Sequence, residues 1–306
     1  MLDALNKLDQ VAVKATNKSA SSSTYVDIMA ETPITRIRTI TSSAAEPPRG
    51  RPIAWLLIAS LPMLMFLLLP LIALLLRIPL AQLLANLANP EVSQAISLSM
   101  VTTGLTVLIT LLLGTPVAYL LARRRFRGHT ALDTLIDLPM VLPPSVAGIA
   151  LLVAFGRRGL LGQYLSVAGI ELAFTTNAVV LAQLFVAAPF YIKAAATGFA
   201  SVDLELEQAA ALDGASPFQV FRHVTAPLAW TALFGGAVMT WARALGEFGA
   251  TIIFAGNFVG RTQTMPLAIY QGFEQDLTVA LTLSVILLAV SFGVLFLVKG
   301  VLRRPL

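Results

Sequence analysis

Long runs of apolar residues, separated by short polar segments, dominate the chain after residue 52. A helix needs about 20 such residues to cross the hydrocarbon core of a membrane. Six runs reach this length, and they predict spans at approximately 53–76, 92–122, 138–156, 172–192, 224–254 and 277–298. Because backbone exposed to lipid must satisfy its own hydrogen bonds, the pattern predicts an all-α integral membrane bundle of six helices.

The composition supports this class and excludes several kinds of site. The chain is 57% hydrophobic and only 12% charged, whereas soluble domains have about 25% charged residues. Without cysteine, it has no disulfide, thiolate metal site or thiol nucleophile. Its two histidines, His129 and His223, lie in separate polar loops. We therefore predict no metal and no cofactor in this chain.

The first 50 residues differ from the rest, because they are polar and rich in Ser, Thr and Ala. No apolar run precedes residue 53, so the segment does not have the pattern of a cleavable secretory signal. We predict a disordered cytoplasmic tail at 1–50. A segment that binds a partner is the alternative.

Basic residues fall mainly on one side of the predicted bundle, and this asymmetry indicates its orientation. The basic side would hold Arg49, Arg51, Arg123, Arg124, Arg125, Arg127, Lys193, Arg222, Lys299, Arg303 and Arg304. The other side would hold Arg77, Arg157, Arg158 and Arg261. Basic loops stay in the cytoplasm, so both termini and the loop at 201–227 are predicted to be cytoplasmic. The net charge of +5 then needs no nucleic-acid partner.

The loop at 201–227 is the conspicuous polar segment between two apolar runs. Ser201 is the expected N-cap of a short helix, and its first turns carry acidic residues that favour a helix start. Leu204–Leu212 is amphipathic, and Gly214 is placed to end this helix. Ser216-Pro217 begins a second short helix with Phe218 and Phe221 on one side. The pattern predicts a helix–glycine–helix elbow along the membrane surface; a plain surface linker is the alternative.

The elbow resembles the coupling loop of permease subunits of ATP-binding-cassette importers. That loop reads E-A-A, three residues, Gly, nine residues, I-x-L-P. Here Gln208, Ala209, Ala210, Gly214 and Val224–Pro227 occupy these places, with Gln208 for Glu, Val224 for Ile and Ala226 for Leu. The resemblance implies the type I importer fold, with residues 51–306 as its transmembrane domain and the elbow docked on an ATPase. The residues implied in ATPase coupling are Glu205, Glu207, Gln208, Ala209, Ala210, Gly214 and Pro227, and Glu207 is the alternative carboxylate for the ATPase contact.

Three further segments resemble molybdate permease subunits. They read DLPMVLPPSVAG at 137–148, WARALGEFGATIIFAGN at 241–257 and GRTQTMPLAIY at 260–270. The resemblance implies a homodimer, two cytoplasmic ATPase subunits that bind the ATP, and a periplasmic oxyanion-binding protein. It implies import of molybdate, with tungstate as a further substrate. Sulfate or thiosulfate is the alternative, because sulfate permeases are similar in the same segments.

Charges and prolines within the spans give candidates for the translocation path. Arg243 and Glu247 lie in a predicted span, where charged side chains are usually functional or paired. Their i,i+4 spacing lets them reach each other, so they either line the path or form a structural pair. Residues Pro143, Pro144 and Ser145 break the third span and either line a cavity or only kink it. Asn257, at the outer end of span five, is a gate candidate or a plain loop residue.

Two other classes of protein compete with the importer interpretation. A membrane-embedded enzyme would need a cluster of His, Asp or Glu at one depth, and only Arg243 and Glu247 are clearly intramembrane. A channel or secondary transporter would need no elbow and would usually show inverted repeats, which the chain does not. It also has no GxxxxGK[ST] motif, so ATP binding by this chain is not expected. We predict a transport subunit that is not itself an enzyme.

Overall fold

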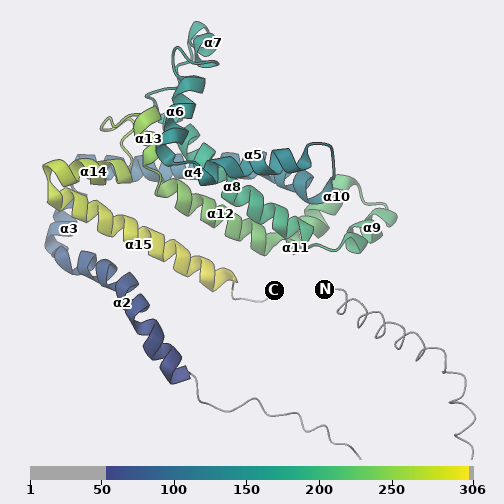
Figure 1. The fold of residues 1–306 in the computed structure, drawn as a ribbon, viewed down its shortest axis with the longest axis horizontal. Coiled ribbons are helices and arrows are strands. Elements are labelled where there is room, and N and C mark those ends of the chain that lie inside the picture. Colours follow the sequence, from purple (N-terminus) through teal and green to yellow (C-terminus); the bar gives the residue numbers. More distant parts are fainter. Residues whose placement is uncertain (1–52, 303–306) are drawn as a thin grey trace, which may run out of the picture. The chain divides into compact units, whose positions relative to one another are not determined.

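The computed structural model describes residues 53–302. The predicted tail at 1–50, with Arg49 and Arg51, and the C-terminal Arg303 and Arg304 lie outside the described residues. Within 53–302 every regular element is a helix, as the apolar runs predicted (Figure 1). The helices are α2 (Ile53–Arg77), α3 (Leu80–Leu87), α4 (Pro90–Arg123), α5 (His129–Val141), α6 (Pro144–Phe155), α7 (Gly162–Val167), α8 (Thr176–Ala200), α9 (Leu204–Leu212), α10 (Pro217–Val220), the π-helix η1 (Phe221–Thr225), α11 (Ala226–Leu228), α12 (Trp230–Leu245), α13 (Gly249–Phe254), α14 (Met265–Gln275) and α15 (Leu277–Leu302).

The number of spans depends on how bent helices are counted. Among the described residues, α2, α4, α8 and α15 are long and apolar enough to cross a membrane by themselves. Two bent pairs also qualify: α5 with α6, bent by 116°, and α10–α11 with α12, bent by 75°. Counting each pair as one span gives six, which agrees with the sequence pattern.

The bend in the third span lies at the predicted prolines. Pro143 and Pro144 have no backbone N–H to continue the hydrogen bonds of α5. Leu142, the residue before them, is extended, with φ −63° and ψ 135°, as steric clash with a following proline requires. The predicted break of the third span is therefore confirmed, and α5 extends back from it to His129.

The fourth and fifth spans differ from the predicted limits. The fourth helix, α8, starts at Thr176, because the Thr175 hydroxyl caps its first turn by accepting a hydrogen bond from the backbone N–H of Ala178. It continues to Ala200. The fifth, predicted as one run over 224–254, is bent by 75° between Leu228 and Trp230. It then ends as α12 at Leu245 and resumes as α13 at Gly249. The apolar run did not reveal this interruption, since a helix break changes backbone geometry without needing a polar segment.

Helices α4, α8 and α12 contact one another and form the centre of the described bundle. Small residues allow the close approach: a Cβ added to Gly236 would lie 2.8 Å from Cβ of Ala194, and one added to Gly198 would lie 2.4 Å from Cβ of Ala232. Hydroxyl groups add hydrogen bonds between α4 and α8. Thr115 Oγ1 and Tyr191 Oη are 2.7 Å apart.

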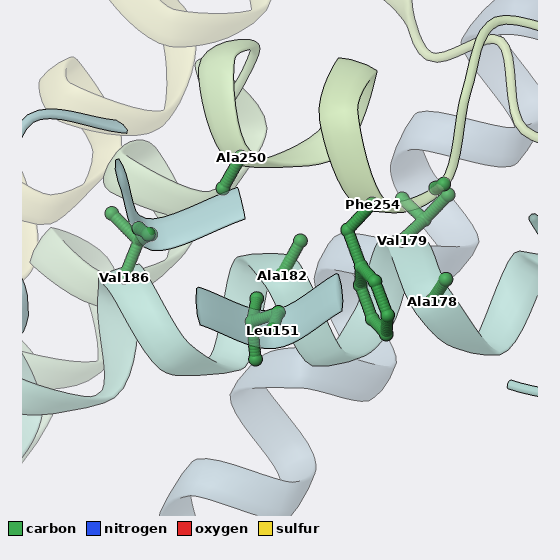
Figure 2. Packing of buried hydrophobic residues seen from close by; sticks show 9 residues of the cluster. Leu151, Ala178, Val179, Ala182, Val186, Ala250 and Phe254 are labelled. Carbon is green, nitrogen blue, oxygen red and sulfur yellow. The ribbon is translucent and has the colours of Figure 1, made fainter. Parts of the chain in front are cut away.

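A second core joins α6, α8 and α13. Leu151 of α6, Val179 of α8 and Phe254 of α13 are buried in one apolar cluster, and Figure 2 shows them side by side. Gly148 of α6 faces the backbone of α13, where an added Cβ would lie 2.9 Å from the carbonyl oxygen of Ala250. This core fixes the two segments that follow the breaks in spans three and five.

Candidate functional site

The first helix of the elbow, α9, is capped by Asp203. Its carboxylate Oδ1 accepts a hydrogen bond of 3.0 Å from the backbone N–H of Glu205. The expectation that Ser201 is the N-cap was wrong. The Ser201 hydroxyl instead donates to the carbonyl of Gly198 at 2.7 Å and closes the end of α8, because α8 continues to Ala200 and brings its last carbonyls to Ser201.

Gly214 ends α9 as predicted. Its φ is +88°, which glycine adopts without the steric cost that a Cβ imposes. The N–H of Ala215 donates to the carbonyl of Ala210, and that of Gly214 to Ala211, both at 3.1 Å. This is the Schellman pattern of helix ends. After this turn, α10 starts three residues later at Pro217.

One side of the elbow is exposed and apolar. No residue of α9 is buried. Leu212 is 89% exposed, and Phe218 of α10 is 67% exposed. Leu204 and Leu206 are also exposed. The predicted amphipathic pattern of α9 was wrong, because Leu204 and Leu206, two positions apart, lie on nearly opposite faces of the helix. Exposed apolar side chains gathered in this way are typical of a surface that another protein covers.

The other side of the elbow is fastened to the bundle. The ring of Phe221 lies edge-on to Tyr119 of α4, with centroids 5.4 Å apart, and 5.8 Å from Phe199 of α8. Thr225 is fully buried. Phe218 and Phe221, expected on one side, therefore have different surroundings: Phe221 packs against the bundle, whereas Phe218 is exposed.

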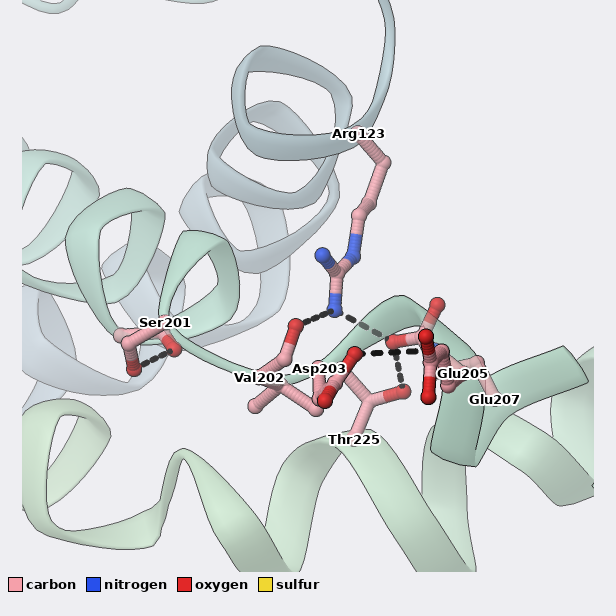
Figure 3. A network of polar contacts seen from close by, with 8 residues as sticks. Arg123, Ser201, Val202, Asp203, Glu205, Glu207 and Thr225 are labelled. Carbon is pink, nitrogen blue, oxygen red and sulfur yellow. Dashed lines mark hydrogen bonds and ion pairs between the residues drawn. The ribbon is translucent and has the colours of Figure 1, made fainter. Parts of the chain in front are cut away.

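An ion pair connects the elbow to the end of α4 (Figure 3). Arg123 Nη2 lies 2.6 Å from Oε1 of Glu207 and donates to the carbonyl of Val202 at 3.1 Å. The Thr225 hydroxyl donates to the same Glu207 oxygen at 2.6 Å. The side chains of Arg123 and Glu207 are only 8% and 12% exposed. The carboxylate of Glu207 therefore faces the bundle rather than a partner.

The other residues predicted for coupling lie on the open side of the elbow. Glu205, Gln208, Ala209 and Pro227 are exposed, and Ala210 is half-buried. The structure separates Glu207 from this group.

Arg243 and Glu247 reach each other, as their i,i+4 spacing predicted. Arg243 Nη1 and Glu247 Oε2 are 2.7 Å apart, with the Arg243 side chain 30% exposed and that of Glu247 1% exposed. The second carboxylate oxygen of Glu247 accepts a hydrogen bond of 2.8 Å from the N–H of Ala250. A carboxylate at a helix start satisfies an otherwise unpaired N–H. Glu247 thus joins the end of α12 to the start of α13.

The breaks of spans three and five meet in space. A Cβ added to Gly249, the first residue of α13, would lie 2.6 Å from Cβ of Pro144. Pro143, Pro144 and Ser145 are exposed, and Pro144 lies at the interruption that holds Glu247.

Asn257 belongs to a different group. Its amide nitrogen donates to Gln271 of α14 at 3.0 Å, and the Gln271 oxygen also accepts from Gln263 at 2.7 Å. Three amide side chains thus lie together after α13.

Residues 114–304 match the family of binding-protein-dependent transport system inner membrane components. The chain belongs to this family. Among relatives of this permease, the molybdenum transport system permease protein ModB of Mycobacterium tuberculosis is 42% identical, over 80% of this chain and 92% of that protein. The molybdate/tungstate transport system permease protein WtpB of Thermococcus kodakarensis is 37% identical, over 72% and 83%.

A solved structure of this fold supports the architecture of the permease. A crystal structure of a bacterial ABC transporter involved in the import of alginate matches with a TM-score of 0.65, covering 82% of this chain and 94% of that one. The two sequences are 17% identical, so the likeness concerns the fold. The predicted all-α permease bundle is confirmed.

Sequence reasoning missed the contacts of Arg123 and Thr225, which stand out in the permease structure. Arg123 was taken only as part of the basic cluster, and Thr225 as part of the motif spacing. One signal distinguishes Arg123: it directly continues the apolar run of α4, whereas Arg124, Arg125 and Arg127 follow the helix end. Leu212 and Phe218 were assigned to the elbow, but their exposure was not predicted, since apolar residues are usually buried.

Proposed function

We propose that this chain is the transmembrane permease subunit of an ATP-driven importer that moves molybdate, with tungstate as a further substrate, across the inner membrane. The substrate is supported by the names of its relatives, one of which is 42% identical over 92% of its own length. Sulfate is not favoured, because the reported relatives carry molybdenum or tungstate in their names.

The observation that carries the mode of action is the two-sided elbow. Its inner side is held by Phe221 and the Arg123–Glu207 pair. Its outer side exposes Leu212 and Phe218 to solvent. Such a surface is suited to a groove of a cytoplasmic ATPase, whose closure on ATP would move the elbow. We include in the proposal a homodimer, two ATPase subunits and a periplasmic oxyanion-binding protein, with both termini in the cytoplasm.

In this proposal the path passes the two helix breaks. Arg243 offers positive charge to an oxyanion, and Glu247 holds Arg243 and the start of α13 in place. The exposed surface of Pro143, Pro144 and Ser145 borders the same region. Movement of α12 relative to α6 would open this region to one side of the membrane and then to the other, as alternating access requires. The chain itself performs no covalent chemistry.

Uptake by the reconstituted complex tests the proposal. Vesicles that contain the permease, its ATPase and the binding protein are supplied with ATP and labelled molybdate. Unlabelled molybdate and tungstate should suppress the signal, and sulfate should not. ADP in place of ATP serves as the control. Suppression by sulfate as strong as that by molybdate would assign the chain to sulfate transport, and uptake with ADP would contradict an ATP-driven importer.

A further inference from the structure

The Glu207 carboxylate has its partners inside its own chain. Oε1 accepts from Arg123 and from Thr225, each at 2.6 Å. The Glu207 side chain is 12% exposed. A carboxylate placed in this way is not free to form the principal contact to another protein, although it lies directly beside the elbow's exposed residues.

The cluster connects segments that are remote in sequence. Arg123 is the last residue of α4, Val202 lies in the loop after α8, Glu207 is in α9 and Thr225 is the last residue of η1. Arg123 and Glu207 are 84 positions apart, and Glu207 and Thr225 are 18 apart. The cluster therefore joins both arms of the elbow to the end of one membrane-spanning helix (Figure 3).

We propose that Arg123, Glu207 and Thr225 form a joint through which displacement of the elbow is transmitted to α4. This inference rests on the proposed function, in which an ATPase moves the elbow. The three are positioning residues: none of them needs to touch the transported anion. The ATPase would displace the elbow through contacts with Leu212 and Phe218, and the joint would transmit this displacement to α4.

Because the side chains of the joint are nearly buried, α9 and α4 resist separation at this point. Separating Arg123 from Glu207 would leave two charged groups away from water, which is costly in a low-dielectric environment. Movement of α9 is therefore cheaper if α4 moves with it. The edge-on contact of Phe221 with Tyr119 of α4 supports the same connection with apolar packing. Because α4 contacts α8 and α12 along the bundle, its movement reaches the segment that bears Arg243.

The geometry of η1 is consistent with this role. Short π-helical turns are irregularities that frequently occur at functional sites. Here the turn rotates Thr225 inward, so that its hydroxyl reaches Glu207. In a regular α-helix through the same residues, the side chain of Thr225 would point in a different direction.

The first experiment measures coupling in the reconstituted complex with Arg123→Met, Glu207→Gln and the double variant. Complex assembly, ATP hydrolysis and molybdate uptake are recorded for each. The double variant has no stranded charge, so it should assemble and hydrolyse ATP. Its uptake per ATP hydrolysed should fall by about 5- to 150-fold, the usual range of a coupling free energy between two sites. Arg124→Met, at the exposed neighbouring position, is the matched control and should couple normally.

A second experiment restores the connection by another bond. The chain has no cysteine, so Arg123→Cys with Glu207→Cys gives each copy of the permease one pair of thiols for a short bifunctional maleimide. Cross-linking should restore uptake per ATP in this variant. The same reagent should not help either single cysteine variant. If the pair only stabilised the fold, the assembled double cysteine variant would show normal uptake per ATP before cross-linking, and the reagent would not change it.

Different failures have different meanings. Normal coupling in the assembled double variant would overturn the joint. Loss of ATPase association with Glu207→Gln, while Arg123→Met still associates, would also overturn it and assign Glu207 to docking. If instead the unmodified complex neither binds the ATPase nor takes up the anion, the proposed function fails before the joint is tested.

Discussion

At the scale of single residues, the ion pairs Arg123–Glu207 and Arg243–Glu247 differ in how far their charges are exposed. Both members of the Arg123–Glu207 pair are nearly buried. In the second pair, Glu247 is 1% exposed whereas Arg243 is 30% exposed. An unpaired Arg243 could turn its tip toward a polar surface. An unpaired Glu247 has no such freedom, and removing its partner strands a buried charge.

This asymmetry predicts unequal effects of neutralising the two residues. Arg243→Met should lower stability by about 3–5 kcal/mol, as found when a buried charge loses its partner. Glu247→Gln should cost less, because its amide oxygen can still accept from Ala250. Thermal unfolding of the purified subunit in detergent measures both. Equal losses would show that Arg243 is as confined as Glu247.

The double variant at these positions separates packing from transport. Arg243→Met with Glu247→Gln should assemble at normal yield, since no unpaired charge remains. Its molybdate uptake should stay low, because this part of the path has lost its positive charge. Complex yield and vesicle uptake are measured side by side. Full uptake would leave the pair with a packing role alone.

Gly214 is the second residue whose substitution has a defined outcome. At φ +88° a residue with a Cβ is strained by about 1–2 kcal/mol, and a β-branched one more. Gly214→Val should leave the subunit in the membrane but weaken ATPase association and abolish uptake. Gly104→Val, at a helical position with no atom within 4 Å of an added Cβ, is the control. Normal association and uptake by Gly214→Val would contradict the role of the elbow.

At the scale of elements, the elbow exposes several apolar side chains, among them Leu212 and Phe218. If Phe218 is buried against the ATPase, it contributes up to about 1.5–3 kcal/mol to binding. Phe218→Ser should then weaken ATPase association roughly 10- to 100-fold. Titration of the detergent-solubilised permease with the ATPase gives the value. The control is Phe126→Ser, in another loop on the predicted cytoplasmic side, which should bind the ATPase as the unchanged protein does. Equal weakening of ATPase binding by both substitutions would indicate a general loss of solubility.

The contact between α6 and α13 is likewise a property of elements. An added Cβ at Gly249 would lie 2.6 Å from Pro144, whereas at Gly246 the nearest atom is 3.7 Å away. Gly249→Ala should therefore cost about 1–3 kcal/mol through overpacking and reduce uptake. Gly246→Ala should be tolerated. Thermal unfolding distinguishes the two variants, and an unchanged Gly249→Ala would mean that the helices can separate freely.

At the scale of the whole molecule, the proposed orientation makes each loop accessible from one side. Because the chain lacks cysteine, single cysteines can be labelled without background. Arg261→Cys should react with a membrane-impermeant maleimide in intact cells. Arg127→Cys should react only in inside-out vesicles. Reaction of both from the same side would contradict the predicted topology.

Much of the architecture could be predicted from the chain, because its signals are local. An apolar run of about 20 residues suffices to indicate a span. Pro143 and Pro144 lack the N–H groups that a continuous helix needs, so they marked the first break. The interruption between Leu245 and Gly249 had no such signal. It depends on Glu247 reaching Ala250 and on the close contact of Gly249 with Pro144, and both require the folded structure.

The sequence by itself determined the class of the protein, the apolar spans and the turn at Gly214, since each depends on properties of neighbouring residues. Only the tertiary structure decided the partners of the charged side chains. Arg123 and Glu207 are 84 positions apart, and whether they meet depends on the rotation of α4 and the placement of α9. Helix rotation is set by packing against other helices, as where Gly198 and Gly236 admit α12 against α8, and local sequence does not encode it.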